Sequence, residues 1–171
     1  AYSGYAVLYA APAMYLCERI RTGLTAGGLY RATAVILLMS AVFEIVGTSG
    51  GAYTYWGPHA FRIFEYPLAI GVLETAQVTC FSLAAAALRQ RTSNPLALAG
   101  LFAIFPCTFY LANFGAGASL IIALHLATPS PLLVAVCSLI SMGSALLLIY
   151  GAAKLLPFVQ GREAFGRVQP A

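Results

Sequence analysis

The sequence predicts an all-α membrane protein, a polytopic helical bundle with about five transmembrane helices and one short re-entrant or interfacial segment. Of its 171 residues, 61% are apolar and only 8% are charged, against roughly a quarter charged in an ordinary soluble domain. The mean hydropathy is +0.86, and no stretch alternates in the manner of a membrane β-barrel. This composition excludes a disordered chain, a conventional soluble enzyme and a nucleic-acid-binding domain, whose basic residues would be clustered.

Four windows have the ~20 mostly apolar residues that a helix needs to cross the hydrocarbon: 32–49, 67–88, 95–116 and 132–153. A shorter window, 2–17, is predicted as a first span clipped at its outer end, because the sequence begins with Ala1 rather than Met. The nine residues 119–127 are too few to cross as a helix, so we expect a re-entrant or interfacial segment there. Residues 1–171 are expected to form a single domain that is truncated at its N-terminus.

Basic residues predict the orientation, since cytoplasmic loops are enriched in Lys and Arg. With five alternating spans, eight basic residues fall on one side: Arg19, Arg21, Arg31, Arg89, Arg91, Lys154, Arg162 and Arg167. Only Arg62 falls on the other side. We therefore expect 18–31, 89–94 and the C-terminal tail in the cytoplasm, and the loop 50–66 outside the cell membrane.

The four cysteines fall one to a span, without a C-x-x-C pair or paired histidines. They are predicted to be small packing residues rather than disulfides or zinc ligands. These residues are Cys17, Cys80, Cys107 and Cys137. No metal and no cofactor is predicted.

Two acidic residues lie inside predicted spans, where a charge costs at least ~2.5 kcal/mol. Glu44 is five residues before the outer end of 32–49, and Glu74 is seven residues after Pro67. At 1.5 Å per residue both lie ~8–11 Å below the outer helix ends, so a hairpin brings them to one depth. Burial and a second carboxylate both favour the neutral acid, and we expect at least one to keep its proton near neutral pH. Such a pair, facing a common cavity, suits general acid/base chemistry.

The loop between these spans is rich in aromatic, polar and glycine residues. Its glycines allow it to fold over the helix ends, which would place Tyr53, Tyr55 and Arg62 over the carboxylates. Trp56 fits an aromatic belt at headgroup level. Other interpretations remain open at this stage: Glu44 bridging structurally to Arg62, and Arg62 pairing with Glu65 at i−3.

Two residues from the second half of the chain are further candidates for the site. His125 is either a proton-transfer group or a buried histidine with one hydrogen bond. Asn113 either hydrogen-bonds into the carboxylate site or caps its helix.

The hairpin also resembles a known family. The motifs are Glu-Ile-Val-Gly-Thr-Ser-Gly-Gly-Ala-Tyr-Thr-Tyr-Trp-Gly at 44–57, Phe-Glu-Tyr-Pro-Leu at 64–68 and Glu-Thr-Ala at 74–76. Together they resemble the core of the avermectin-type spirocyclase (AveC-like) integral membrane family, which is common in actinobacteria. The resemblance covers about residues 35–115 and departs at Ile70, where some members carry Glu. The founding member closes a hydroxy-ketone polyketide into a spiroketal, with optional dehydration. A weaker likeness, through Glu44, Gly47, Tyr53 and Tyr55, is to membrane carotenoid hydratases.

The resemblance and the polar residues together predict a cyclase or (de)hydratase of secondary metabolism. It would act by metal-independent acid/base catalysis on a lipophilic polyketide-, terpenoid- or steroid-like substrate. The predicted catalytic residues are Glu44, Glu74, Tyr53 and Tyr55, and the predicted substrate-binding residues are Arg62, Trp56, Asn113 and His125. The alternative is a non-catalytic membrane subunit or small-molecule carrier. Expected partners are a lipophilic small molecule and membrane lipid, within a homo-oligomer or membrane complex, and no nucleic acid.

Overall fold

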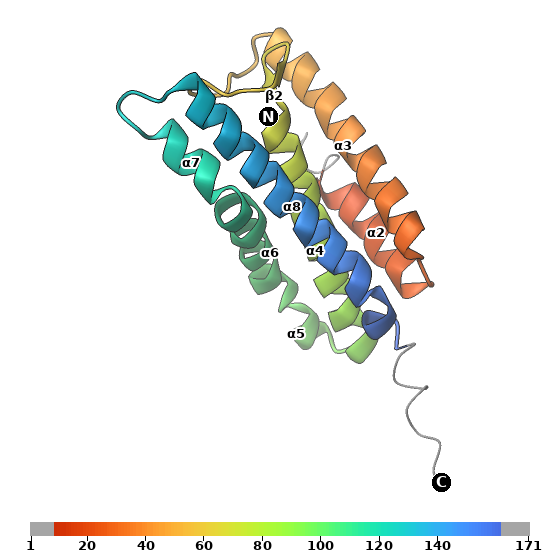
Figure 1. Ribbon diagram of the computed structural model, residues 1–171. Helices are drawn as coiled ribbons and strands as arrows, with labels where there is room; N and C mark the ends of the chain where they lie inside the picture. The colour runs from red at the N-terminus through yellow and green to blue at the C-terminus, as the bar shows by residue number, and fades with distance from the viewer. Residues whose placement is uncertain (1–8, 162–171) are drawn as a thin grey trace.

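The computed structural model of the chain describes residues 9–161 and confirms the predicted all-α bundle (Figure 1). Its helices are α2 (Ala11–Arg21), α3 (Ala26–Ser49), α4 (Leu68–Arg91), α5 (Pro95–Leu98), α6 (Leu101–Phe109), the π-helix η2 (Tyr110–Ala116), α7 (Ala118–Leu124) and α8 (Pro131–Val159). Two short antiparallel strands, β1 (Arg62–Ile63) and β2 (Tyr66–Pro67), form a hairpin just before α4.

Helix α4 is the centre of the bundle, and most of its length is buried. It packs against α2, α3, α6, η2 and α8. Figure 1 shows α2 and α3 on one side of the α4–α8 pair and the helices from α5 to α7 on the other. Small residues on α4 are fully or nearly fully buried, among them Ala76, Thr79 and Ala86. Small side chains let neighbouring helices approach closely, which is how helices associate in lipid.

Four helical segments of the described chain are long and apolar enough to cross a membrane: Ala26–Ser49, Leu68–Arg91, Pro95–Ala116 and Pro131–Val159. The predicted count of five spans is therefore too high by one within residues 9–161. The part of the predicted first span that the structure describes belongs to α2. That helix has 11 residues and is about 17 Å long, whereas a bilayer core is ~30 Å thick. Residues 2–8, and the expected truncation at the N-terminus, lie outside the described residues.

Two other boundaries differ from the prediction. Helix α3 starts at Ala26 rather than at 32, because the Thr25 side chain caps it by accepting a hydrogen bond from the Gly28 N–H at 3.1 Å. Arg31 consequently lies on a helix and not in a turn. Of the window 119–127, residues 119–124 belong to α7 (Ala118–Leu124), which packs on α8 and donates a hydrogen bond from Ser119 to the Cys137 carbonyl.

The span predicted at 95–116 is interrupted rather than continuous. It consists of α5, α6 and η2 in succession. Pro106 lies inside α6 and lacks the N–H that would continue the ladder. The π-helix follows four residues later, and such segments commonly mark a local break in α-helical geometry.

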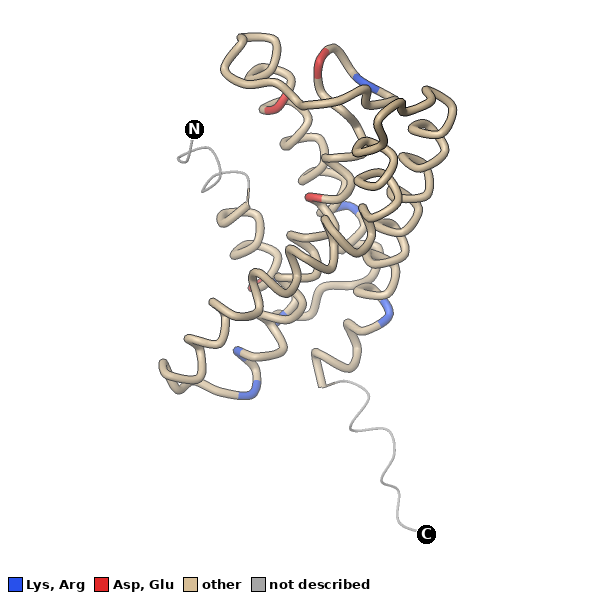
Figure 2. The backbone as a smooth tube through the Cα atoms, turned by 90° about the vertical axis from the view of Figure 1, so that its left-hand side faces the viewer, with Lys and Arg blue, Asp and Glu red and all other residues tan. Residues whose placement is uncertain are grey.

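Charged positions are sparse along the backbone (Figure 2), and the two ends of the bundle differ. At one end the Gln160 amide donates to the carbonyls of Ile20 and Leu24 at 3.0 and 2.9 Å, and Arg89 lies 3.9 Å from Glu18. The α2–α3 turn and the ends of α4 and α8 are therefore neighbours. The opposite end carries the loop 50–66 with Arg62. Among residues 9–161 the distribution of basic residues agrees with the predicted one. Arg162 and Arg167 lie outside the described residues.

Candidate active site

Glu44 lies on the buried face of α3 and is only 5% exposed. One of its carboxylate oxygens, Oε2, accepts two hydrogen bonds, from the Tyr53 hydroxyl at 2.7 Å and from the Tyr55 hydroxyl at 2.6 Å. The two tyrosine rings meet edge to face, 6.1 Å apart. Short hydrogen bonds of this kind are typical of a hydroxyl that donates to an ionised acceptor.

Glycine makes this arrangement possible. A Cβ built on Gly47 would stand 2.7–2.9 Å from three atoms of Tyr53, which are its hydroxyl oxygen and two carbons of its rigid ring. A side chain at 47 would therefore push Tyr53 away from α3 and from Glu44. Gly51 and Gly57 adopt positive φ angles of +72° and +91°, a conformation that glycine reaches without strain. With these turns the loop folds back over the end of α3, as the sequence predicted.

Glu74 faces α3 from α4 and lies within the same interface. Its Oε2 accepts a hydrogen bond from the Ser40 hydroxyl at 3.0 Å, and the Tyr9 hydroxyl is a second hydrogen-bonding partner. Ser40 is one helical turn before Glu44, so the two side chains are neighbours on α3. The Glu44 carboxylate consequently acts electrostatically on Glu74. Unlike Glu44, Glu74 is only half-buried.

No cation balances either carboxylate among the described residues. The salt bridges there join Arg21 and Arg89 to Glu18, and Arg62 to Glu65. The partners of Glu44 and Glu74 are instead hydroxyl groups, contributed by Tyr53, Tyr55, Ser40 and Tyr9.

Tyr66 is completely buried beside this cluster. Its hydroxyl lies against α4, where a Cβ on Gly71 would overlap it. The hydroxyl is next to Ser40 but makes no hydrogen bond of good geometry. Its ring is 6.2 Å from that of Tyr55. A buried hydroxyl without a partner is costly, so the Tyr66 hydroxyl has an unused capacity to donate into this cluster.

Tyr55 and Tyr66 both keep their protons at neutral pH. Burial, followed by the hydrogen bond to Glu44 and the charge of Glu74, raises the pKa of Tyr55. Burial and the charge of Glu74 likewise raise the pKa of Tyr66. The site therefore presents neutral phenol donors beside carboxylate acceptors, which are complementary groups for moving a proton.

Arg62 does not reach the carboxylates, so the open alternative of a Glu44–Arg62 bridge is not formed. Its guanidinium donates to Glu65 at 2.9 Å and to the carbonyls of Gly57 at 2.7 Å and Tyr55 at 3.4 Å. Of the interpretations left open, the pairing of Arg62 with Glu65 at i−3 is the one that is formed. Arg62 thus braces the loop that carries Tyr55, because the loop's carbonyls lie nearer to it than the buried acid does.

Three further predicted substrate-binding residues lie elsewhere. Trp56 is 68% exposed, and its ring stacks on that of His125 at 5.4 Å. The exposed His125 follows α7 directly, and its Nδ1 donates to the Ile121 carbonyl at 2.8 Å. Asn113 donates to the Gln77 side chain at 2.9 Å, which ties η2 to α4. None of these contacts involves Glu44 or Glu74.

The cavity expected between the carboxylates stays a prediction. Two cavities of the described chain, one between α2 and α3 and one beside Thr75, are lined by neither Glu44 nor Glu74, whose carboxylates contact hydroxyl groups. Sequence reasoning missed Ser40, Tyr66 and Tyr9. The spacing of four between Ser40 and Glu44 was an available signal, since it puts both on one helix face.

Residues 9–161 contain no group of three His, Cys, Asp or Glu side chains that could hold a metal ion. All four cysteines are free. Comparisons with protein-family models, with curated proteins and with solved structures found no match to this chain. Its function is therefore argued from the site itself.

Proposed function

We propose that this chain is a membrane enzyme that cyclises or (de)hydrates a lipophilic substrate by moving protons at the α3–α4 interface. One observation carries the proposal: two carboxylates share the α3–α4 interface of an apolar bundle, and their partners are hydroxyl groups rather than cations. An ionisable residue at membrane depth is costly, and function is the default explanation for one. A purely structural pair would be expected to contain a cation.

The geometry suits addition and elimination across a carbon–oxygen bond. In a cyclisation, a base removes the proton of the attacking hydroxyl while an acid protonates the carbonyl oxygen, and no net proton is consumed. In a dehydration, the acid protonates the leaving hydroxyl and the base takes the proton from the neighbouring carbon. Both reactions need one proton donor and one acceptor, set a substrate-sized gap apart.

The solvent accessibility of the two carboxylates assigns their roles. Glu74 keeps accessible surface, so it is the carboxylate that meets the substrate. Glu44 is enclosed and acts through Tyr55, whose hydroxyl both donates to Glu44 and stands in the tyrosine cluster. The resemblance to spirocyclases adds the substrate class, a polyketide-, terpenoid- or steroid-like molecule. Its support is that segment 44–57 supplies Glu44, Tyr53 and Tyr55 to one hydrogen-bonded group.

The test is turnover of Glu44→Gln and Glu74→Gln in lipid nanodiscs. Hydroxy-ketones and unsaturated terpenoids serve as probes, and deuterium uptake from D₂O reports any proton transfer. Gln keeps the shape and loses the transferable proton, so turnover should fall by the ~10²–10⁴ typical of losing a general acid or base. The melting temperature should be no lower than wild type, since buried catalytic acids are commonly a stability liability.

Glu65→Gln is the matched control, because Glu65 is an exposed acid paired only with Arg62 among the described contacts. It should keep wild-type turnover. Wild-type turnover in Glu44→Gln on a confirmed substrate would remove the catalytic assignment. A clear drop in its melting temperature without a catalytic loss would favour the alternative, a non-catalytic subunit or carrier.

The orientation is part of the proposal. The end that gathers Arg19, Arg21 and Arg89 faces the cytoplasm, following the bias of basic residues. Cysteines introduced at the exposed Ser93 and Thr54 test it. In intact cells an impermeant maleimide should label position 54 and spare position 93. Labelling of position 93 alone would invert the topology.

A further inference from the structure

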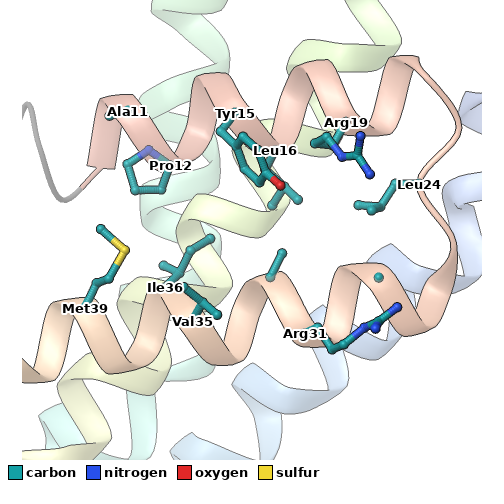
Figure 3. A pocket seen from close by; sticks show the side chains of 12 residues that line it. Ala11, Pro12, Tyr15, Leu16, Arg19, Leu24, Arg31, Val35, Ile36 and Met39 are labelled. Atoms are coloured by element: carbon teal, nitrogen blue, oxygen red, sulfur yellow. The ribbon is translucent and has the colours of Figure 1, made fainter.

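A separate cleft runs between α2 and α3 (Figure 3) and has a volume of about 610 Å³. This volume falls within the 300–1,000 Å³ of sites that hold small molecules. Its walls are apolar over most of their length, formed by side chains such as Pro12, Leu16, Val35 and Ile36. The cleft is not lined by the carboxylates of the candidate active site.

Two arginines, one from each helix, line the same end of this cleft. Figure 3 shows Arg19 on α2 and Arg31 on α3 near the turn that joins the helices, with Met39 at the other end. Neither arginine has a salt bridge within residues 9–161. The acid nearest in sequence, Glu18, is taken by Arg21 at 2.8 Å and lies 3.9 Å from Arg89. An apolar slot with two unneutralised guanidinium groups at one end is complementary to an anion with an apolar chain.

The other end of the cleft lies close in sequence to the hydrogen-bonding partners of Glu74. It is lined by Ala11 on α2 and Met39 on α3. Tyr9 is two residues before Ala11, and Ser40 follows Met39. Tyr9 and Ser40 are the hydrogen-bonding partners of Glu74. From Arg31 to Met39 the helix rises by about 12 Å, so a chain anchored at the arginines extends toward Glu74.

We propose that the α2–α3 cleft binds a single-chain lipophilic carboxylate, with its carboxylate between Arg19 and Arg31 and its chain directed toward Glu74. The cleft volume of about 610 Å³ favours a single-chain ligand over a two-chain bilayer phospholipid. Resting on the proposed function, the same geometry specifies the substrate: a lipophilic acid whose reacting hydroxyl, carbonyl or alkene lies about 12 Å or more from its carboxylate.

Binding of palmitate, compared with hexadecanol, tests the cleft without requiring turnover. The protein is placed in phosphatidylcholine nanodiscs and bound probe is measured at equilibrium. We expect palmitate to bind at least about tenfold more tightly than hexadecanol, since charge-assisted hydrogen bonds to the head group are lost in the alcohol. Arg19→Gln and Arg31→Gln should each weaken palmitate binding about tenfold and leave hexadecanol binding unchanged.

Three further variants keep the result interpretable. Arg91→Gln, at the same end of the bundle but outside the cleft and stacked on Phe158, should bind palmitate as wild type does. Arg19→Lys should retain most of the binding, which shows that the site still folds. Ala32→Phe, which fills the cleft from α3, should weaken both probes.

Equal binding of palmitate and hexadecanol would overturn the anion site, as would an equal loss in Arg91→Gln. Tighter binding of hexadecyl phosphate than of palmitate would overturn the carboxylate assignment. The outcome is separable from the proposed function, because Glu74→Gln should lose turnover and still bind palmitate. If palmitate did not bind but turnover was intact, the proposed ligand site in the cleft would be overturned and the proposed catalytic function would stand. If palmitate bound as proposed but Glu74→Gln kept wild-type turnover, the catalytic role of Glu74 would be overturned and the ligand site in the cleft would stand.

Discussion

The α3–α4 and α7–α8 interfaces both bury hydroxyl groups, but they use them differently. Between α7 and α8, Ser119 bonds to the Cys137 carbonyl at 3.1 Å and to the Ser141 hydroxyl at 2.9 Å, and the Leu120 N–H donates to Ser141 at 3.3 Å. Every member of that network is neutral. Between α3 and α4, hydroxyls donate instead into Glu44 and Glu74.

This difference indicates a structural role for the α7–α8 interface and supports the proposed catalytic role of the α3–α4 interface. A neutral serine network joins two helices and leaves no charge to be solvated, which is sufficient for packing in lipid. A carboxylate at the same depth adds a desolvation cost that packing alone does not require. If the α3–α4 interface is functional, changes there should affect turnover more than stability, and changes at the α7–α8 interface should do the reverse.

Apart from the changes to Glu44 and Glu74 themselves, the largest effect should come from Gly47→Ala. The added methyl group would meet the Tyr53 ring at under 3 Å, and overpacking of this kind costs about 1–3 kcal/mol. Tyr53 would be displaced from Glu44, so turnover should also fall at least about tenfold. Circular-dichroism melts beside the turnover assay measure both effects.

Gly143→Ala is the control for that substitution. Gly143 lies inside α8, and a methyl group added there would meet nothing within 4 Å, so alanine should stabilise the helix by up to ~1 kcal/mol. If Gly47→Ala matched Gly143→Ala in both melting temperature and turnover, the position of Tyr53 beside Glu44 would not depend on its close contact with Gly47 of α3.

A matched pair of serine substitutions sharpens the comparison between the interfaces. Ser141→Ala removes the acceptor of Leu120 and the partner of Ser119, and should cost about 1–2 kcal/mol of stability with turnover unchanged. Ser40→Ala removes one donor to Glu74, which keeps Tyr9. It should lower turnover severalfold with a smaller change in melting temperature. The reverse pattern would place the functional interface at α7–α8.

Arg62→Met should have a smaller effect, through the loop. Arg62 holds the carbonyls of Gly57 and Tyr55, so its loss should cost about 1 kcal/mol and reduce turnover a few-fold by loosening Tyr55. Glu65→Gln, which removes only the exposed partner of Arg62, should change neither. An Arg62→Met loss as large as that of Glu44→Gln would mean that Arg62 acts on the reacting groups directly.

Much of this arrangement could be predicted from the sequence. Apolar windows of ~20 residues indicate spanning helices directly, and four of the five predicted ones are present. The depth of Glu44 and Glu74 follows from helix rise, and the glycines of 47–57 indicate a folded loop. These predictions succeed because they depend on local periodicity and length.

The remaining details depend on tertiary contacts. A serine in an apolar helix usually bonds to the carbonyl four residues before it, as Ser138 does with Val134. Nothing local distinguishes Ser40, which turns to Glu74 instead. Whether Arg62 meets Glu44 or the loop carbonyls depends on the loop's backbone path, which residue spacing does not specify.

The smallest expected effect is a pH dependence at His59, in the loop over the candidate active site. Burial, aided by the charge of Arg62 and opposed by a hydrogen bond with the Trp56 backbone, lowers the pKa of His59. Its ring lies 6.3 Å from that of Tyr55. The folded protein therefore favours the neutral imidazole, and the unfolded chain binds the proton more readily.

Because the folded pKa is the lower one, the contribution of His59 to stability is present above about pH 6.5, the unfolded value. It is lost as the pH falls below that value. Melting temperatures of wild type and His59→Gln, compared between pH 7.5 and 5, should converge toward the acid side, because both proteins share every other titrating group. If the melting temperature of His59→Gln changed with pH as that of wild type does, water would have free access to His59. The contrast between the α3–α4 interface and the neutral α7–α8 interface would then weaken accordingly.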